Sequence, residues 1–287
     1  MASLNPSTDI SSFINTIFEA SMLVARDNNF MTGVVRVFND RQGLAPRKNS
    51  QYGGMTINSL AETDDMVGQA FTPSNIATIT PSEAGGQYFF TDNRVKSDPF
   101  SVINDASQDM GLAMATKMET DLISNFSSFT GGTVGSAGSV ITWNYLLAAE
   151  AQLKARKAPY PYFVALSPYQ WQPLAKAASV ASTSATNASP DLLNEVNKGM
   201  FFVKQVGGLF IYTTSNISSD ASDDAVGGMW SRDAIALDIR TQPYIERERD
   251  ASRRGTELNL STTYGHGVWR PTFGIKLVFD NAVPTGV

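Results

Sequence analysis

The stretch that decides the fold is Asp98–Phe129, with the sequence DPFSVINDASQDMGLAMATKMETDLISNFSSF. Its apolar residues recur every four positions, the pattern of a helix with one buried face. We therefore predict a helix over about residues 99–129, roughly 45 Å long at 1.5 Å per residue. The predicted buried stripe comprises Val102, Ala106, Met110, Met114, Met118, Leu122 and Phe126, and the charged residues left for other faces are Asp105, Asp109, Lys117, Glu119 and Asp121.

Both ends of this helix are marked in the sequence. Asp98 is a suitable cap, and Pro99 suits the first helical position, where a missing N–H costs nothing. The helix should stop before the glycine-rich run 130–138, because glycine disfavours helix. A helix this long exceeds the usual 11–12 residues or so of globular proteins. We interpret its methionines as core residues rather than a cofactor site.

Composition excludes several functions. The chain has 287 residues and a net charge of −5, which argues against a nucleic-acid-binding protein with a basic face. It has no cysteine and a single histidine, His266, so thiol chemistry and sites with two imidazoles are excluded. Neither a signal peptide nor a transmembrane helix is expected, which predicts a soluble protein made in a cytoplasm. We predict no cofactor and no metal.

The segments before the helix predict an arm with a short helix over residues 1–27 and an extended loop over 28–75. Such a long connection is rare in a compact domain unless it has a purpose. We place a basic tip in the loop and an acidic cluster at its base, and expect both to contact other subunits. A solvated, disordered tip is the alternative, since exposed ion pairs add little. The basic residues are Arg36, Arg41, Arg47 and Lys48, and the acidic ones are Glu62, Asp64 and Asp65.

The segments after the helix have a different sequence pattern. Residues 140–235 alternate predicted helices and strands: a helix over 143–157 with Leu146, Leu147 and Leu153 buried, a strand over 162–166 and a helix capped by Ser167. Residues 236–287 read mostly as strands that return to pair beside the long helix. We therefore predict an α+β fold in which residues 76–139 and 236–287 form one domain and the α/β lobe 140–235 is inserted.

A charged strand near residue 250 is a second candidate contact. On a strand of period two, its acids face one way and its arginines the other, which suits a contact between subunits around a symmetry axis. A surface ladder of ion pairs within one chain is the alternative. The candidate contact residues are Glu246, Arg247, Glu248, Arg249, Arg253 and Arg254.

Other candidate sites favour ordinary structural roles. His266 has no recognisable nucleophile nearby, so a surface or packed histidine is favoured over a general base. The pairs of glycines do not fit a phosphate-binding loop and read as turns. Asp220, Asp223 and Asp224 lack the spacing of an EF-hand, so a solvated loop is favoured over a calcium site. We predict no catalytic residue.

The order of these parts resembles the major capsid proteins of tailed bacteriophages, which have the Hong Kong 97-type fold. Two local stretches strengthen the resemblance. FVALSPYQW, residues 163–171, looks like the axial-domain strand and helix of that family. MWSRDAIAL, residues 229–237, together with TYGHGVWRP and GIKLVFDNA further on, looks like its peripheral strands. The resemblance implies an N-terminal arm, an extended loop, a spine helix, a peripheral β-sheet and an inserted α/β axial domain.

The resemblance also implies a function. Many copies would form hexamers and pentamers that close into an icosahedral shell around double-stranded DNA, in a virion assembled in the bacterial cytoplasm. A separate scaffolding protein and a portal are implied as partners, and decoration proteins are possible. The nearest alternative is an encapsulin, which shares the fold and packages an enzyme. An alternative of another class is a hydrolase with an inserted α/β domain. With one histidine and no cysteine, such an enzyme would have to use paired carboxylates as its acid and base.

Overall fold

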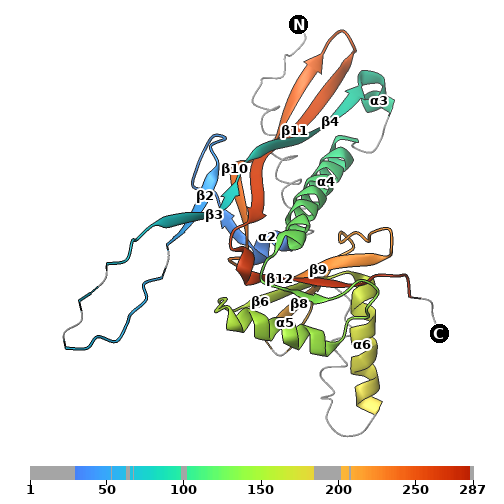
Figure 1. Cartoon of the computed structure of the whole chain (residues 1–287). Coiled ribbons are helices and arrows are strands. Elements are labelled where there is room, and N and C mark those ends of the chain that lie inside the picture. Colours follow the sequence, from blue (N-terminus) through green and yellow to red (C-terminus); the bar gives the residue numbers. More distant parts are fainter. Residues whose placement is uncertain are drawn as a thin grey trace.

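A computed structural model of the chain describes residues 30–52, 54–62, 65–66, 68–97, 102–183, 202–206 and 208–284. The predicted arm and the cap at Asp98 and Pro99 lie outside these residues, as does a short helix that the sequence predicts over 190–198. At the centre is one long helix, α4 (Val102–Ser124), which continues as the 3-10 turn η1 (Asn125–Ser128) (Figure 1). Within the described residues, its 23 residues are fewer than the predicted thirty or so.

The predicted apolar stripe of α4 is confirmed as its buried face from Ala106 onward, while the side chain of Val102 lies outside the described residues. Ala106, Met110, Met114, Met118, Leu122 and Phe126 are all buried. One charged residue contradicts the prediction, because Glu119 is also buried rather than left on an outer face. Thr214 Oγ1 donates a hydrogen bond to Glu119 Oε1 at 3.1 Å. Burial raises the pKa of Glu119, and the hydrogen bond from Thr214 opposes this shift.

A four-stranded sheet lies beside α4, in the order β1-β10-β11-β4. Its strands come from both halves of the chain, as predicted, because β4 precedes α4 while β10 and β11 follow the lobe. β10 is continuous over 16 residues, whereas the sequence predicts two shorter strands over 234–239 and 245–250. The elements are α2 (Met31–Val34), β1 (Arg36–Phe38), β4 (Ser82–Thr91), α3 (Asp92–Ser97), β10 (Ile235–Asp250) and β11 (Gly255–Val268).

The lobe holds a six-stranded sheet in the order β5-β12-β9-β6-β8-β7. The predicted helix near 143–157, the strand 162–166 and the helix after Ser167 are confirmed as α5, β6 and α6. The elements are β5 (Thr133–Gly135), α5 (Trp143–Ala155), β6 (Tyr162–Leu166), α6 (Pro168–Thr183), β7 (Phe202–Val206), β8 (Leu209–Thr213), β9 (Asp224–Ser231), η2 (Pro271–Phe273) and β12 (Gly274–Asp280).

Both faces of this sheet are covered, which explains why every residue of β6 is buried. Phe163 and Ala165 belong to the core formed with α4 and η1, whereas Val164 and Leu166 belong to the core beneath α5 and α6. The predicted face of α5 is confirmed in part. Leu146 and Leu153 are buried, but Leu147 is 56% exposed.

Two strand pairings differ from the sequence-based expectation. The last strand, β12, joins the sheet of the lobe between β5 and β9 instead of the sheet beside α4. The sequence also predicts a hairpin of strands 75–80 and 87–90 around a turn at 81–86, but the consecutive strands β3 (Pro73–Ile79) and β4 do not pair, since β3 pairs with β2 (Arg47–Tyr52) and β4 pairs with β11. Short-range patterns identify strands but do not choose their partners.

Candidate functional site

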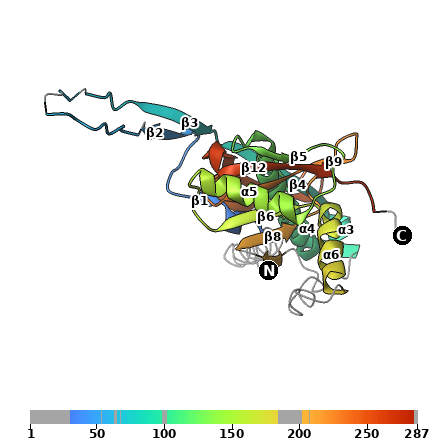
Figure 2. The ribbon, with the colours of Figure 1, turned by 60° about the horizontal axis from the view of Figure 1, so that its bottom comes forward.

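The hairpin of β2 and β3 projects from the rest of the molecule in both views (Figures 1 and 2). Its antiparallel register joins Arg47 to Ile79 at the root and Tyr52 to Pro73 at the far end, and residues 54–72 extend beyond. These outer residues include large apolar side chains with little cover from the described chain. Their exposed fractions are 79% for Met55, 88% for Ile57, 79% for Met66 and 76% for Phe71. A monomer does not ordinarily display such a surface.

The register reverses the predicted charge arrangement of the loop. Arg47 and Lys48 lie at the root, and Glu62 and Asp65 lie beyond the far end of the strands, so the acidic cluster is at the tip rather than the base. The remaining acid, Asp64, lies outside the described residues. The error arose because the sequence does not show which extended run pairs with β2.

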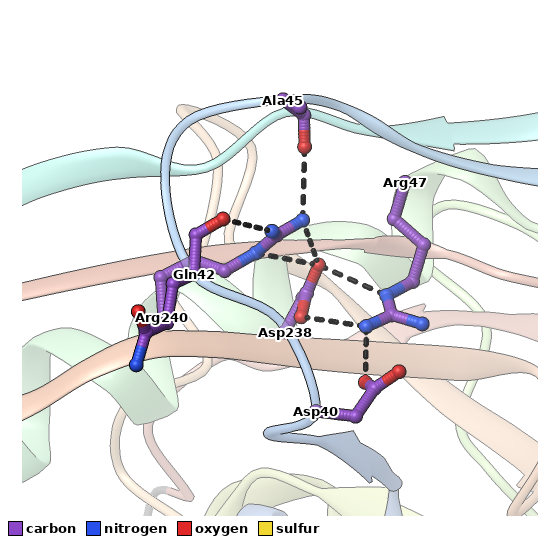
Figure 3. A network of polar contacts seen from close by, with 6 residues as sticks. All are labelled: Asp40, Gln42, Ala45, Arg47, Asp238 and Arg240. Carbon is purple, nitrogen blue, oxygen red and sulfur yellow. Dashed lines mark hydrogen bonds and ion pairs between the residues drawn. The ribbon is translucent and has the colours of Figure 1, made fainter.

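The root of the hairpin is held by a buried cluster of charged side chains, the root network (Figure 3). Arg47 donates from Nε to Asp238 Oδ2 at 3.0 Å and from Nη2 to Asp238 Oδ1 at 3.3 Å. Arg240 donates to the same Asp238 Oδ2 from Nε at 3.1 Å and from Nη2 at 2.8 Å. The side chains of Arg47, Asp238 and Arg240 are only 8%, 0% and 1% exposed.

Two further contacts complete the root network. Arg240 donates from Nη2 to Ala45 O at 2.9 Å and from Nη1 to Gln42 O at 3.4 Å, which fixes the segment leading into β2 (Figure 3). Asp40 accepts a hydrogen bond from Arg47 Nη2, and this bond lowers the pKa of Asp40. The buried carboxylate of Asp238 is therefore shared by both arginines, and the exposed Asp40 adds a second carboxylate at the edge of the network.

The root network joins segments nearly 200 residues apart, because Asp238 and Arg240 belong to β10. Bidentate pairing by a planar guanidinium fixes direction as well as distance. We infer that it sets the angle at which the hairpin leaves the molecule. The sequence analysis missed Asp238 and Arg240, although two charges at alternate positions of an apolar strand signal buried partners.

The remaining basic candidates of the loop region are distributed differently. Arg36 pairs with Asp233 of the same chain at 3.1 Å, while Arg41 and Lys48 are exposed. Arg47 has little surface left for another subunit. Contacts of these residues with other copies stay a prediction.

The charged strand region lies at the tip of the β10–β11 hairpin and forms ion pairs within the chain. Arg249 pairs with Asp92 of α3 at 2.6 Å, and Arg253 lies 3.6 Å from Asp250 and 3.8 Å from Glu257. This pattern agrees with the ladder alternative. The other candidates, Glu246, Arg247, Glu248 and Arg254, are exposed, and their contacts between subunits stay a prediction.

His266 is a packed residue joined to α4. Its Nδ1 lies 3.0 Å from Asn125 Nδ2, and its Nε2 lies 4.0 Å from Asp121 Oδ2. Burial lowers the pKa of His266, and nearby Asp121 opposes this shift. Tyr264 Oη donates to Asp121 Oδ2 at 2.6 Å, and burial together with this bond raises the pKa of Tyr264.

The aspartates near residue 220 organise a loop. Asp220 Oδ1 accepts from the backbone N–H of Ser222 at 2.8 Å and of Asp224 at 3.0 Å, and Asp224 Oδ1 accepts from Gly138 N at 2.6 Å. Within the part of the chain that the structure describes, no three acidic or histidine side chains gather as a metal site requires. In the same part, no helix is long and apolar enough to cross a membrane.

Comparison with known proteins adds a family and a fold. A family model described as "Phage capsid protein" matches residues 76–277. This match begins after the exposed part of the hairpin. A search of curated protein sequences found no match.

Solved structures resemble the chain over most of its length. The capsid of cyanophage P-SCSP1u matches with a TM-score of 0.67 and 16% identity, covering 86% of this chain and 87% of that one. A structure from Mycobacterium phage Che8 gives 0.66 and 15%, with coverages of 82% and 85%. The capsid of Ralstonia phage GP4 gives 0.67 and 11%, with coverages of 88% and 88%. Identities this low show a shared fold.

Proposed function

The chain belongs to the phage capsid protein family, and from that membership we propose that it is a major capsid protein, a structural protein whose copies build the icosahedral shell of a virion. In this proposal the copies form hexamers and pentamers, and the closed shell encloses double-stranded DNA. The coarse assignment to a virion capsid agrees with the solved phage capsids that share the fold.

The observation that carries the proposal is the projecting hairpin with its exposed apolar side chains. An isolated two-stranded hairpin is at best marginally stable in water, and exposed apolar strands promote aggregation. Both problems disappear when the hairpin lies on a neighbouring copy. Each copy of a closed shell meets several others, so individually weak contacts combine by avidity.

The proposal extends to partners by analogy with the family. A separate scaffolding protein would guide curvature, a portal would occupy one vertex, and decoration proteins could bind outside. The net charge of −5 does not contradict packaged DNA, because the inner face of a shell need only avoid binding the DNA strongly. Assembly would take place in the cytoplasm of a bacterial host.

The test is expression of the full chain in bacteria, with and without a co-expressed scaffolding protein, followed by size-exclusion chromatography and negative-stain electron microscopy. Capsomers, sheets or closed shells are expected in the earliest fractions. Nuclease-protected DNA in particles from infected cells would separate a virus shell from an encapsulin. A chain that remains a monomer of 31.0 kDa under every condition would overturn the proposal.

A further inference from the structure

The six-stranded sheet of the lobe carries opposite charges at its two ends. β9 begins at Asp224 and ends at Ser231, and it lies antiparallel to β12, with Asp224 opposite Asp280 and Trp230 opposite Gly274. β6 starts opposite the end of β9, since Tyr162 pairs with Ser231. Eight residues at 3.3 Å each separate the two ends by roughly 25 Å.

The end of the sheet near Ser231 is basic, and we call it the basic end. It comprises Arg156, Lys157, Arg232 and Arg270. Hydrogen bonds hold these segments together: Ser231 Oγ donates to Pro159 O at 2.6 Å, and Arg270 N donates to Ala234 O at 3.1 Å. All four side chains are exposed, and none lies within ion-pair distance of a carboxylate of the described residues. Asp233 also lies here, but Arg36 neutralises it.

The other end of the sheet is acidic, and we call it the acidic end. It comprises Asp220, Asp223 and Asp280, which lie together because Asn281 N donates to Asp223 O at 2.6 Å and Asp220 N donates to Asp224 O at 2.7 Å. These carboxylates form no ion pair with a cation of the described residues. One cation, Lys176, lines the same groove as Asp280.

We propose that the basic end of one copy binds the acidic end of the next copy, so that the lobes associate head to tail. A contact between two different patches is heterologous, and repeating it generates a ring when the rotation closes. Opposite charges at opposite ends give each copy one site of each kind. Two like ends repel, which disfavours a contact between two basic ends or between two acidic ends.

This inference rests on the proposed function and specifies which surfaces of the lobe meet within a capsomer. Arg232 and Arg270 also make local contacts: Arg232 Nε donates to Val35 O at 3.3 Å, and the Arg270 guanidinium lies 5.2 Å from the Phe273 ring. Long-range steering by unpaired charges raises association rates and weakens as salt screens it. We therefore expect the contact to form faster and tighter at low ionic strength.

The test reverses each end separately and then both. The basic-end variant is Arg156→Glu, Lys157→Glu and Arg270→Glu, which leaves Arg232 and makes this end acidic, and the acidic-end variant is Asp223→Lys with Asp280→Lys, which leaves Asp220 and makes that end basic. Each is expected to raise the protein concentration needed for capsomer formation at least about tenfold, because each puts like charges together. The variant with all five substitutions restores opposite charges at the two ends and should assemble like the wild type. A mixture of the two single-end variants should co-assemble.

The controls separate this inference from the proposed function. The wild type, measured by native mass spectrometry and electron microscopy, tests the function itself, and its failure to assemble would overturn both. If the wild type assembles and each single-end variant assembles equally well, the head-to-tail contact alone is overturned. Folding of each variant is checked by thermal unfolding. If a reversal unfolds the chain, the neutral pair Arg270→Gln and Asp223→Asn must each reduce the salt dependence of assembly between about 0.05 and about 0.5 M NaCl.

Discussion

Met114 and Met118 of α4 are 6% and 7% exposed, whereas Met55 and Met66 of the hairpin loop are both 79% exposed. The helix and the loop therefore carry similar side chains in opposite environments. The helix buries its apolar stripe within its own chain, whereas the loop leaves its apolar residues exposed. One region stabilises the monomer and the other, in the proposed function, stabilises the shell.

The largest expected effect comes from the buried side of this comparison. Phe126→Ala removes a ring that is 1% exposed and lies 5.0 Å from the Trp230 ring, so it should leave a cavity and cost about 3–5 kcal/mol of unfolding free energy. Chemical denaturation of the monomer measures the loss. The matched loop variant Phe71→Ala should change it by no more than about 0.5 kcal/mol. Equal losses of unfolding free energy in the two variants would contradict the conclusion that α4, and not the loop, stabilises the monomer.

The second effect tests the junction between the two regions. Asp238→Asn removes the charge that Arg47 and Arg240 share, leaving two buried cations, and should cost about 3 kcal/mol. Limited proteolysis within residues 54–72 should also accelerate, because the root of the hairpin loosens. Asp40→Asn is the control, since Asp40 is exposed and its loss leaves the pairing with Asp238 intact. A fully stable Asp238→Asn protein would refute the anchoring role.

A smaller effect concerns the buried carboxylate of the helix. The pKa of Glu119 is raised by burial in the folded chain, so the native state holds its proton more tightly than the unfolded chain does. Stability from this group is complete below about pH 4.3, the unfolded value, and is lost as pH rises through the folded pKa. Glu119→Gln should therefore raise stability at pH 7, by up to about 1 kcal/mol, with no gain in acid. Thermal unfolding at both pH values measures this difference.

The smallest effect on the monomer has the largest consequence for assembly. Ile57→Ser with Met66→Ser changes side chains that are 88% and 79% exposed, so unfolding free energy should change by less than about 0.5 kcal/mol. Particle yield should nevertheless fall, because the loop loses its apolar contact with a neighbour. Surface serines such as Ser215 and Ser218, replaced by Ala, serve as controls. Normal particles from the loop variant would show that the loop is dispensable.

Local patterns predicted much of this fold. The period of four from Ala106 to Phe126 identified the buried face of α4, and the run 162–166 identified a buried strand. Both features depend on residues that are close in sequence. The resemblance in the order of parts then supplied the family, which the match over residues 76–277 supports.

Long-range pairings were beyond the reach of such patterns. β12 pairs with β9, and Arg47 bonds to Asp238 across 191 positions, so neither relation leaves a periodic signal. The burial of Glu119 was not predicted, because a helical period identifies only the apolar face of a helix. It does not reveal that another segment, here the one with Thr214, covers a second face. The acidic loop tip was misplaced because the partner of β2 was unknown.

The root network fixes the angle at which the hairpin leaves the molecule, and this angle determines the position of the hairpin tip. From Arg47 to the tip, about 16 extended residues give the hairpin a reach of roughly 50 Å. A tilt of about 10° at the root would then move the tip by roughly 9 Å, nearly twice the spacing of adjacent strands. Arg47, Asp238 and Arg240 hold the hairpin at this angle, so in the proposed shell they would limit how far its tip can shift.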